Sequence, residues 1–198
     1  GLIPTTSKCV TLTLDYLLDH PDLLERAQAS ARDENTETIC KYVLESLRFN
    51  SFGAGIFRDT LQVYTVAKGT LRRKTFKKGT RVMVATQSAM LDGRQLKKPK
   101  AFSLDRPEYQ YMHYGYGMHT CFGYYINMVQ IPIIVKAVLK CAGLQRQSGE
   151  AGKTGYDGPF PNHLRLRFTP PNPSAGSAVP PSTGESPAQQ AQSPETVT

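Results

Sequence analysis

The stretch Tyr114–Gly123 constrains this chain most, because it places one cysteine, Cys121, between closely spaced glycines and a long apolar run. Glycine adopts positive φ at no steric cost, so the backbone before Cys121 can pass close to a flat ligand. The apolar run begins at Tyr124 and predicts a helix just after the cysteine. The N–H groups of its first turn and the helix dipole would favour the thiolate form of the sulfur.

This arrangement fits a cysteine that binds haem iron. Gly123 has no side chain, so the new helix could lie directly against a porphyrin face. An electron-rich thiolate on the iron favours cleavage of an O–O bond. The alternative is a glycine-rich turn before a core helix, with Cys121 as an inert buried thiol.

The other cysteines indicate neither a zinc site nor a disulfide framework. Cys9, Cys40 and Cys141 show no Cys-x-x-Cys spacing, and no paired histidines accompany them. Scattered thiols fit a reducing compartment, so we expect an intracellular protein, cytoplasmic or membrane-associated. The 198 residues could hold one domain with a sizeable core, and a start at Gly1 predicts a fragment or processed piece.

The cysteine stretch resembles the haem-binding loop of the cytochrome P-450 superfamily, Phe-x-x-Gly-x-Arg-x-Cys-x-Gly. The matching positions are Tyr114, Gly117, His119, Cys121 and Gly123, with Tyr for Phe and His for Arg. The resemblance implies haem b with Cys121 as the axial thiolate ligand of iron. It also implies that Tyr114 packs under the haem and that His119 binds a propionate.

Two further motifs of that family follow in the family's order. Glu45 and Arg48 form Glu-x-x-Arg, and Arg106 ends a segment similar to Pro-x-x-Phe-x-Pro-Glu-Arg. The resemblance implies one buried structural network of the three side chains, whereas Glu-x-x-Arg alone would be a surface pair. Arg58 stands where the family places a propionate-binding arginine; an edge-strand cation is the alternative.

The chain begins with Gly1-Leu2-Ile3-Pro4-Thr5-Thr6, which resembles the end of the family's distal helix, Ala/Gly-Gly-x-Asp/Glu-Thr-Thr. Thr5 matches the threonine that acts with an acid in proton delivery during dioxygen activation, so it is a catalytic candidate. Pro4 replaces the acid, which argues against ordinary monooxygenation. The alternative is that Pro4 only starts or kinks a helix near the chain end.

Periodicity predicts a mainly α chain with small β-sheets. The resemblance covers about residues 1–168 and implies that they form the C-terminal half of a cytochrome P-450 fold. We expect two helices in residues 1–30, then helices at 34–49, 87–92 and 124–141, the last buried on most sides, with a kink at Pro132 and a C-cap at Gly143. Strands are expected within 55–85 and at 164–168, with irregular chain at 93–107, a loop at 145–158, and surface or loop positions for His113 and His163. Residues 169–198, rich in Pro, Ser, Ala and Gln, predict a disordered tail.

The net charge of +8 comes mainly from basic clusters at residues 72–78 and 97–100. Aromatic residues do not interleave as in a base-stacking surface, so the pattern argues against nucleic-acid binding. A solvated hairpin face, an acidic electron donor and an anionic membrane surface remain open as explanations. Residues 124–141 are long enough to raise a membrane span, but their polar residues and Pro132 argue against one.

A finer resemblance links the chain to the haem-thiolate domain of fungal fatty-acid dioxygenase fusions, of the linoleate diol synthase and psi-factor-producing oxygenase type. It rests on Pro4, on the loop with His119, and on Gly158-Pro-Phe-Pro-Asn162. It implies a lipid substrate, an N-terminal peroxidase-type domain as partner, and isomerisation of a fatty-acid hydroperoxide to a diol in oxylipin formation. The alternatives are a monooxygenase that needs a reductase and a non-catalytic fragment; in either enzyme, this piece alone is expected to be inactive.

Overall fold

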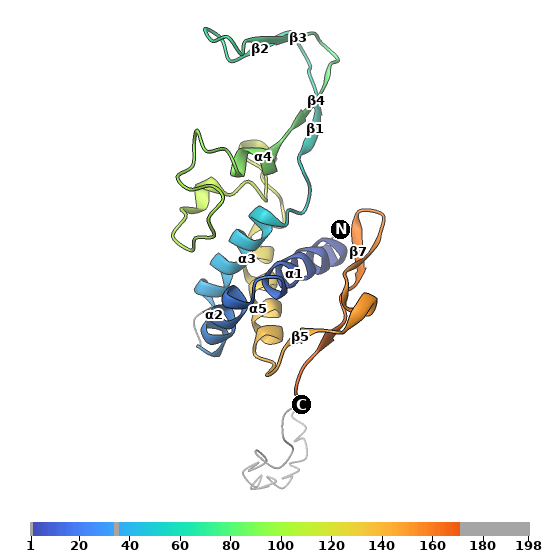
Figure 1. Cartoon of the computed structure of the whole chain (residues 1–198). Helices are drawn as coiled ribbons and strands as arrows, with labels where there is room; N and C mark the ends of the chain where they lie inside the picture. The colour runs from blue at the N-terminus through green and yellow to red at the C-terminus, as the bar shows by residue number, and fades with distance from the viewer. Residues whose placement is uncertain (1, 34–35, 171–198) are drawn as a thin grey trace, which may run out of the picture.

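The structure is a computed structural model that describes residues 2–33 and 36–170, so nearly all of the expected tail lies outside the described residues. A helical body carries four small sheets of two strands each, and one of these extends far from the body (Figure 1). The prediction of a mainly α chain with small β-sheets is confirmed.

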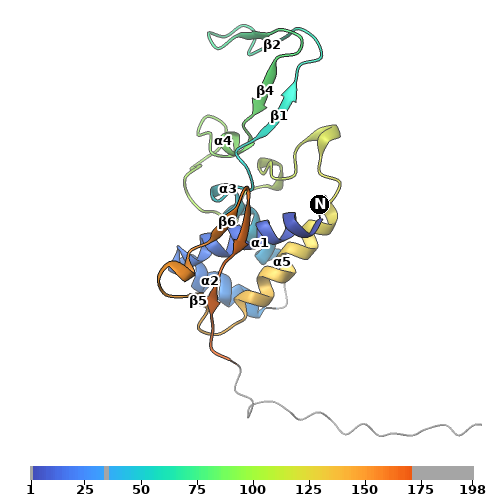
Figure 2. The same ribbon diagram turned by 90° about the vertical axis from the view of Figure 1, so that its right-hand side faces the viewer.

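Four helices form the body: α1 (Leu2–Leu18), α2 (Pro21–Arg32), α3 (Glu37–Phe49) and α5 (Tyr124–Leu139). Figure 2 shows α1, α2 and α5 packed together, with α3 behind them. The chain turns at His20, and Pro21 opens α2 because the first helical turn needs no N–H donor there. The fully buried side chains that hold the helices together include Leu17, Ala27, Ile39, Leu47, Ile131 and Val135.

Helix α5 is buried on one face only, so the expectation of burial on most sides is wrong for this chain. Ile131 and Val135 lie in the core, whereas Tyr125, Val129 and Ile133 are exposed. No layer of the described residues 2–33 and 36–170 covers the second face. Gly143 is also not the C-cap: α5 ends at Leu139, and Gly143 takes its positive φ of 61° in the turn that follows.

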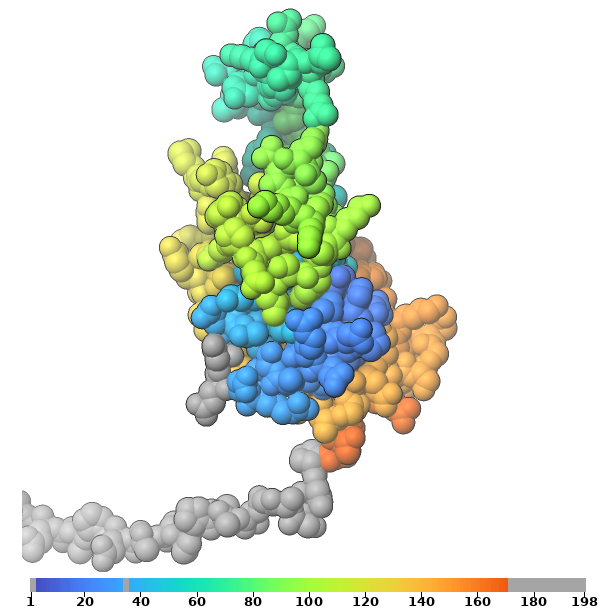
Figure 3. Space-filling view, turned by 60° about the vertical axis from the view of Figure 1, so that its left-hand side comes forward, coloured from blue at the N-terminus to red at the C-terminus, as the bar shows by residue number. Residues whose placement is uncertain are grey.

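The sheets after α3 form a long ribbon. Strand β1 (Ile56–Asp59) pairs antiparallel with β4 (Arg81–Val84), and β2 (Tyr64–Val66) pairs with β3 (Lys74–Phe76) at the far end. Figure 3 shows this far end as a knob that stands off from the helical body. Helix α4 (Thr86–Met90) then leads into the irregular segment that the sequence predicts, which closes with the 3₁₀ turn η1 (Glu108–Gln110).

The C-terminal part contains more strand than the sequence predicts. Strand β5 (Gln145–Arg146) pairs with β8 (Leu166–Arg167), and β6 (Gly155–Asp157) pairs with β7 (Phe160–His163). The expected loop over 145–158 is therefore wrong, since it holds β5, β6 and the 3₁₀ turn η3 (Gly149–Gly152). Strand β7 contacts α1 and so brings the end of the chain back to its beginning. In the described part of the chain, no helix has the length and apolar character that crossing a bilayer requires.

Candidate functional site

The loop before α5 has a fixed backbone that presents Cys121. The Cys121 N–H donates to the Tyr114 carbonyl at 2.7 Å, and the Cys121 carbonyl accepts the Tyr124 N–H at 3.1 Å, at the start of α5. The 3₁₀ turn η2 (Gly117–His119) lies between Tyr114 and Cys121. The Cys121 side chain is exposed. The loop therefore closes on itself and leaves the sulfur free to meet a ligand.

Two glycines of this loop lie where a side chain would meet close neighbours. Gly115 has a φ of 79°, and a Cβ there would lie 2.6 Å from the His119 carbonyl oxygen. At Gly123, a Cβ would lie 3.1 Å from the Asn127 amide nitrogen and 3.8 Å from the Cys121 sulfur. A side chain at Gly115 would therefore displace the loop backbone, and one at Gly123 would press on Asn127 and fill the space next to the sulfur.

Three of the predicted cofactor-binding residues line one cavity. Arg58 from β1, together with Tyr114 and His119 from the cysteine loop, borders a space of about 480 Å³. The Arg58 guanidinium donates to the neighbouring Phe57 carbonyl at 2.8 Å, and the Tyr114 ring meets Tyr124 edge-on. Cys121 and Thr5 are not among the lining residues, although Tyr114 and Cys121 are joined through the backbone.

The remaining cysteines suit an iron ligand less well than Cys121. Burial raises the pKa of the Cys9 thiol to about 11, and it raises that of Cys40 to about 11 as well. Both sulfurs are therefore held as neutral thiols at neutral pH, whereas the ligand must be a thiolate. Cys141 follows the far end of α5, away from the glycine loop.

Glu45 lies at the centre of the charged network beneath the ribbon. Arg48 binds its carboxylate in a bidentate manner, at 3.0 and 2.6 Å, and Arg106 Nε donates to it at 3.1 Å. The Ser103 N–H and the Tyr111 hydroxyl also donate, at 3.0 and 2.9 Å. Burial alone would raise the pKa of the Glu45 carboxyl, but Arg48, Tyr111 and Ser103 together hold it below its ordinary value.

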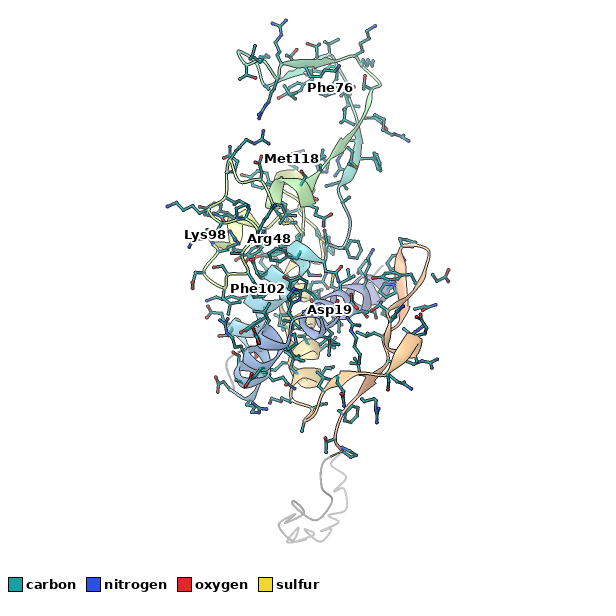
Figure 4. All side chains as sticks on the ribbon, in the orientation of Figure 1. Asp19, Arg48, Phe76, Lys98, Phe102 and Met118 are labelled. Atoms are coloured by element: carbon teal, nitrogen blue, oxygen red, sulfur yellow. The ribbon has the colours of Figure 1, made fainter. Side chains whose placement is uncertain are left out.

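The two arginines also bind backbone carbonyls at the end of α4 and in the irregular segment. Both Glu45 and Arg48 have side chains that are 0% exposed. The carbonyl acceptors are Met90, Pro99 and Ala101 for Arg48, and Lys97, Lys98 and Ala101 for Arg106. Figure 4 shows the labelled Arg48 beside the segment that carries Lys98 and Phe102. The network thus fixes a segment that has no regular structure of its own.

His113 lies in a turn of the irregular chain, as expected of a loop histidine, but it is half-buried rather than at the surface. Its Nε2 lies 2.8 Å from the Leu44 carbonyl, its ring stacks on Tyr111, and it borders the same cavity as Arg58. Burial lowers the pKa of His113 to about 4. It is therefore neutral at pH 7, with Nε2 as the donor. Tyr111, whose hydroxyl donates to the Glu45 carboxylate, belongs to none of the sequence motifs, so no sequence signal pointed to it.

Helix α1 contacts α5 through Thr6, which follows the predicted catalytic residue Thr5. The buried Thr6 hydroxyl donates to the Asn127 side-chain oxygen at 3.2 Å, while Thr5 is half-buried and Pro4 is exposed within the first turn of α1. The first acidic residue of α1 is Asp15. The helix therefore has no carboxylate beside Thr5.

One cavity residue was not singled out in the sequence. Lys8, on α1, is buried, and its ammonium lies over the ring of Phe52. It borders the cavity together with Phe160 of β7. A lysine in an otherwise ordinary helix sequence gives no sign of burial, because the rings that cover it come from distant parts of the chain.

These residues fit a haem group. An exposed cysteine follows a loop whose glycines leave room beside the sulfur, and a cavity next to that loop carries an arginine and a histidine for carboxylates. The comparison with known proteins agrees with this fit, since residues 3–159 match the protein family described as cytochrome P-450. The chain belongs to the cytochrome P-450 family. Membership implies a haem-thiolate cofactor.

Solved cytochromes P-450 share the fold. The structure of a Mycobacterium marinum cytochrome P-450 in its substrate-free form is similar, with a TM-score of 0.69 and 27% identity. The match covers 85% of this chain and 42% of that protein. The chain is thus part of a cytochrome P-450 fold, as the sequence predicts.

Curated relatives include fungal oxygenases and a fungal diol synthase. A bifunctional dioxygenase–epoxy alcohol synthase of Fusarium oxysporum is 27% identical over 160 residues, which is 77% of this chain and 12% of that protein. Psi-producing oxygenase A of Aspergillus fumigatus is 25% identical over 158 residues, 77% of this chain and 14% of that protein. A linoleate diol synthase of Gaeumannomyces graminis is 35% identical over 75 residues, 38% of this chain and 6% of that protein.

Proposed function

We propose that this chain forms the proximal part of a haem-thiolate domain that isomerises a fatty-acid hydroperoxide to a diol within a longer oxylipin-forming protein. When bound, the haem would supply an iron centre whose thiolate ligand, Cys121, favours O–O cleavage. Arg58 and His119 would bind its propionates, and Tyr114 would pack against its face. Residues 1–168 would make up the domain, and 169–198 a separate tail.

The observation that carries this proposal is the start of α1. Pro4 is next to Thr5, and no acidic residue precedes Asp15 on this helix. Dioxygen activation needs protons delivered beside the iron, whereas isomerisation uses an O–O bond that the substrate already contains. The names of the fungal relatives support the same class of reaction, with a diol or an epoxy alcohol as the product.

The test is isotopic. The complete protein that contains this chain would receive a fatty-acid hydroperoxide with both oxygens labelled, without NADPH or reductase. We expect both labelled oxygens in one product molecule, because isomerisation neither adds nor removes an atom. Strict dependence on reductase and dioxygen would reject the proposal.

A monooxygenase served by a reductase is the second candidate, and one observation favours it. Six exposed cations lie on the ribbon without an acidic residue among positions 60–80: Lys68, Arg72, Arg73, Lys74, Lys77 and Lys78. Such a surface attracts an acidic electron donor. If the ribbon serves that purpose, reversing these charges would slow reduction of the haem while leaving peroxide-driven turnover unchanged.

A further inference from the structure

Lys8 is a buried cation without an acidic partner. Its side chain is 8% exposed, and its Nζ lies 4.3 Å from the centroid of Phe52 and 5.3 Å from that of Phe160. Among residues 2–33 and 36–170, none of the ion pairs includes Lys8. An isolated ammonium group is costly to bury, so buried cations usually have a counter-ion.

The aromatic contacts offset only part of this cost. A cation–π contact contributes about 0.5–2 kcal/mol, well below the full cost of removing an ammonium from water. Burial lowers the pKa of Lys8 from its ordinary value, which agrees with a desolvated site. A negative group from outside the described chain would complete the site.

The space beside Lys8 suits a molecule that is mostly apolar. Lys8 borders the cavity of about 480 Å³ together with Phe52, Phe160, Ile56 and Met90. A cavity with apolar walls and a few placed polar groups is typical of small-molecule sites, in which the polar groups fix the orientation of the ligand. A hydrocarbon chain that ends in a carboxylate has this distribution of polarity.

The haem propionates alone do not account for every basic side chain of the cavity. A haem b carries two propionates, and the site already offers Arg58 and His119 for them. His113 also borders the cavity but is neutral at pH 7, so Lys8 is a further basic side chain, and it comes from α1, outside the ribbon and the cysteine loop. Figure 1 shows α1 beginning next to the C-terminal strands that carry Phe160.

We propose that Lys8 binds the carboxylate of an acid with an apolar chain, and so fixes which end of that chain enters the cavity. That the acid is a fatty acid rests on the proposed function. Away from water, an ammonium–carboxylate hydrogen bond is short and strong. An ester of the same acid would leave Lys8 unpaired, and a site built to bind a polar group rejects an analogue that lacks it.

The experiment compares linoleic acid with its methyl ester by calorimetry on the complete, haem-loaded protein. Lys8→Met should weaken binding of the free acid by about 30-fold or more, as expected for loss of one partner of a buried charge pair. Binding of the ester should change little. Lys8→Arg should keep the preference for the acid, and Lys140→Met, which removes an exposed lysine just after α5, should behave as wild type.

The haem content of Lys8→Met separates the two sources of a carboxylate. If the variant loses haem while its acid-to-ester preference is unchanged, Lys8 serves a propionate and the proposal is overturned. Equal weakening for acid and ester, or none, overturns it as well. The binding measurement does not depend on turnover, so the two proposals can fail separately. If the preference for the acid depends on Lys8 but the enzyme needs a reductase, the proposed function is rejected and the role of Lys8 stands. If the enzyme isomerises the hydroperoxide but Lys8→Met leaves the preference for the acid unchanged, only the role of Lys8 is rejected.

Discussion

Each side chain of the candidate site has a position that its neighbours impose. Cys121 projects from a loop that its own N–H closes onto Tyr114, and Gly115 and Gly123 keep side chains away from it. Lys8 and His113 border the same cavity. Each is covered by residues that are remote from it in sequence. A residue's chemistry here follows from its burial as much as from its type.

The first prediction at this scale concerns the iron ligand. Cys121→Ser in the complete protein should abolish the thiolate-type spectrum of the reduced carbon monoxide complex, since a serine hydroxyl does not supply a thiolate. Cys141→Ser, at the far end of α5, is the matched control and should leave the spectrum unchanged. Persistence of that spectrum in Cys121→Ser would show that another residue binds the iron.

His113 predicts a dependence of stability on pH. Its pKa in the fold is about 4, below the ordinary value of 6.5, because the ring is buried. Between these two values the unfolded chain binds one more proton than the folded chain. The free energy of unfolding therefore falls as the pH is lowered from about 6.5 to about 4, by up to about 1.4 kcal/mol per pH unit. Above pH 6.5 this contribution of His113 to stability is fully present.

Urea denaturation of the complete protein at pH 7 and pH 5 measures this effect. His113→Gln can still donate to the Leu44 carbonyl but does not titrate, so its loss of stability over this interval should be smaller. His163→Gln, at an exposed position on β7, is the control. An equal pH dependence in wild type and His113→Gln would contradict the assignment.

At the scale of elements, the Glu45 network joins α3 to the segment that precedes the cysteine loop. Removal of one partner of a buried pair leaves an uncompensated charge, at a cost of about 3–5 kcal/mol. Glu45→Ala should therefore yield a complete protein that fails to retain haem, measured as haem per polypeptide. Glu37→Ala, which removes an exposed helix acid that pairs with Lys41 at i+4, should retain haem. Normal haem content in Glu45→Ala would make the network dispensable.

The motifs predict local geometry and its immediate partners, and little beyond them. Arg48 follows Glu45 by three residues on one helix, so their contact is set within α3. Strand β5 instead depends on a partner strand about twenty residues away, in which Arg167 lies opposite Gln145. A strand of only two residues is too short to show a pattern of alternating polarity in the sequence. The burial of Lys8 likewise depends on Phe52 and Phe160, which only the folded chain brings to α1.

For the whole molecule, the exposed face of α5 has the largest consequence. Tyr125, Ile126, Val129 and Ile133 form an apolar stripe at helical spacing, and the described residues leave it open to solvent. Large contiguous apolar patches are rare on monomeric proteins and mark surfaces that associate. We therefore expect the 198-residue chain to require a partner layer on α5.

The last prediction follows from this open face. Expressed alone, the 198-residue chain should aggregate and bind haem substoichiometrically, because the stripe would associate between molecules before haem is retained. Size-exclusion chromatography and the ratio of haem to protein absorbance measure both properties. Replacing Val129 and Ile133 by glutamate should reduce aggregation, since charge on the stripe opposes its association. The same change at Leu61, an exposed apolar residue of the ribbon, should have a smaller effect. A soluble, monomeric chain with one haem per polypeptide would show that the face needs no partner.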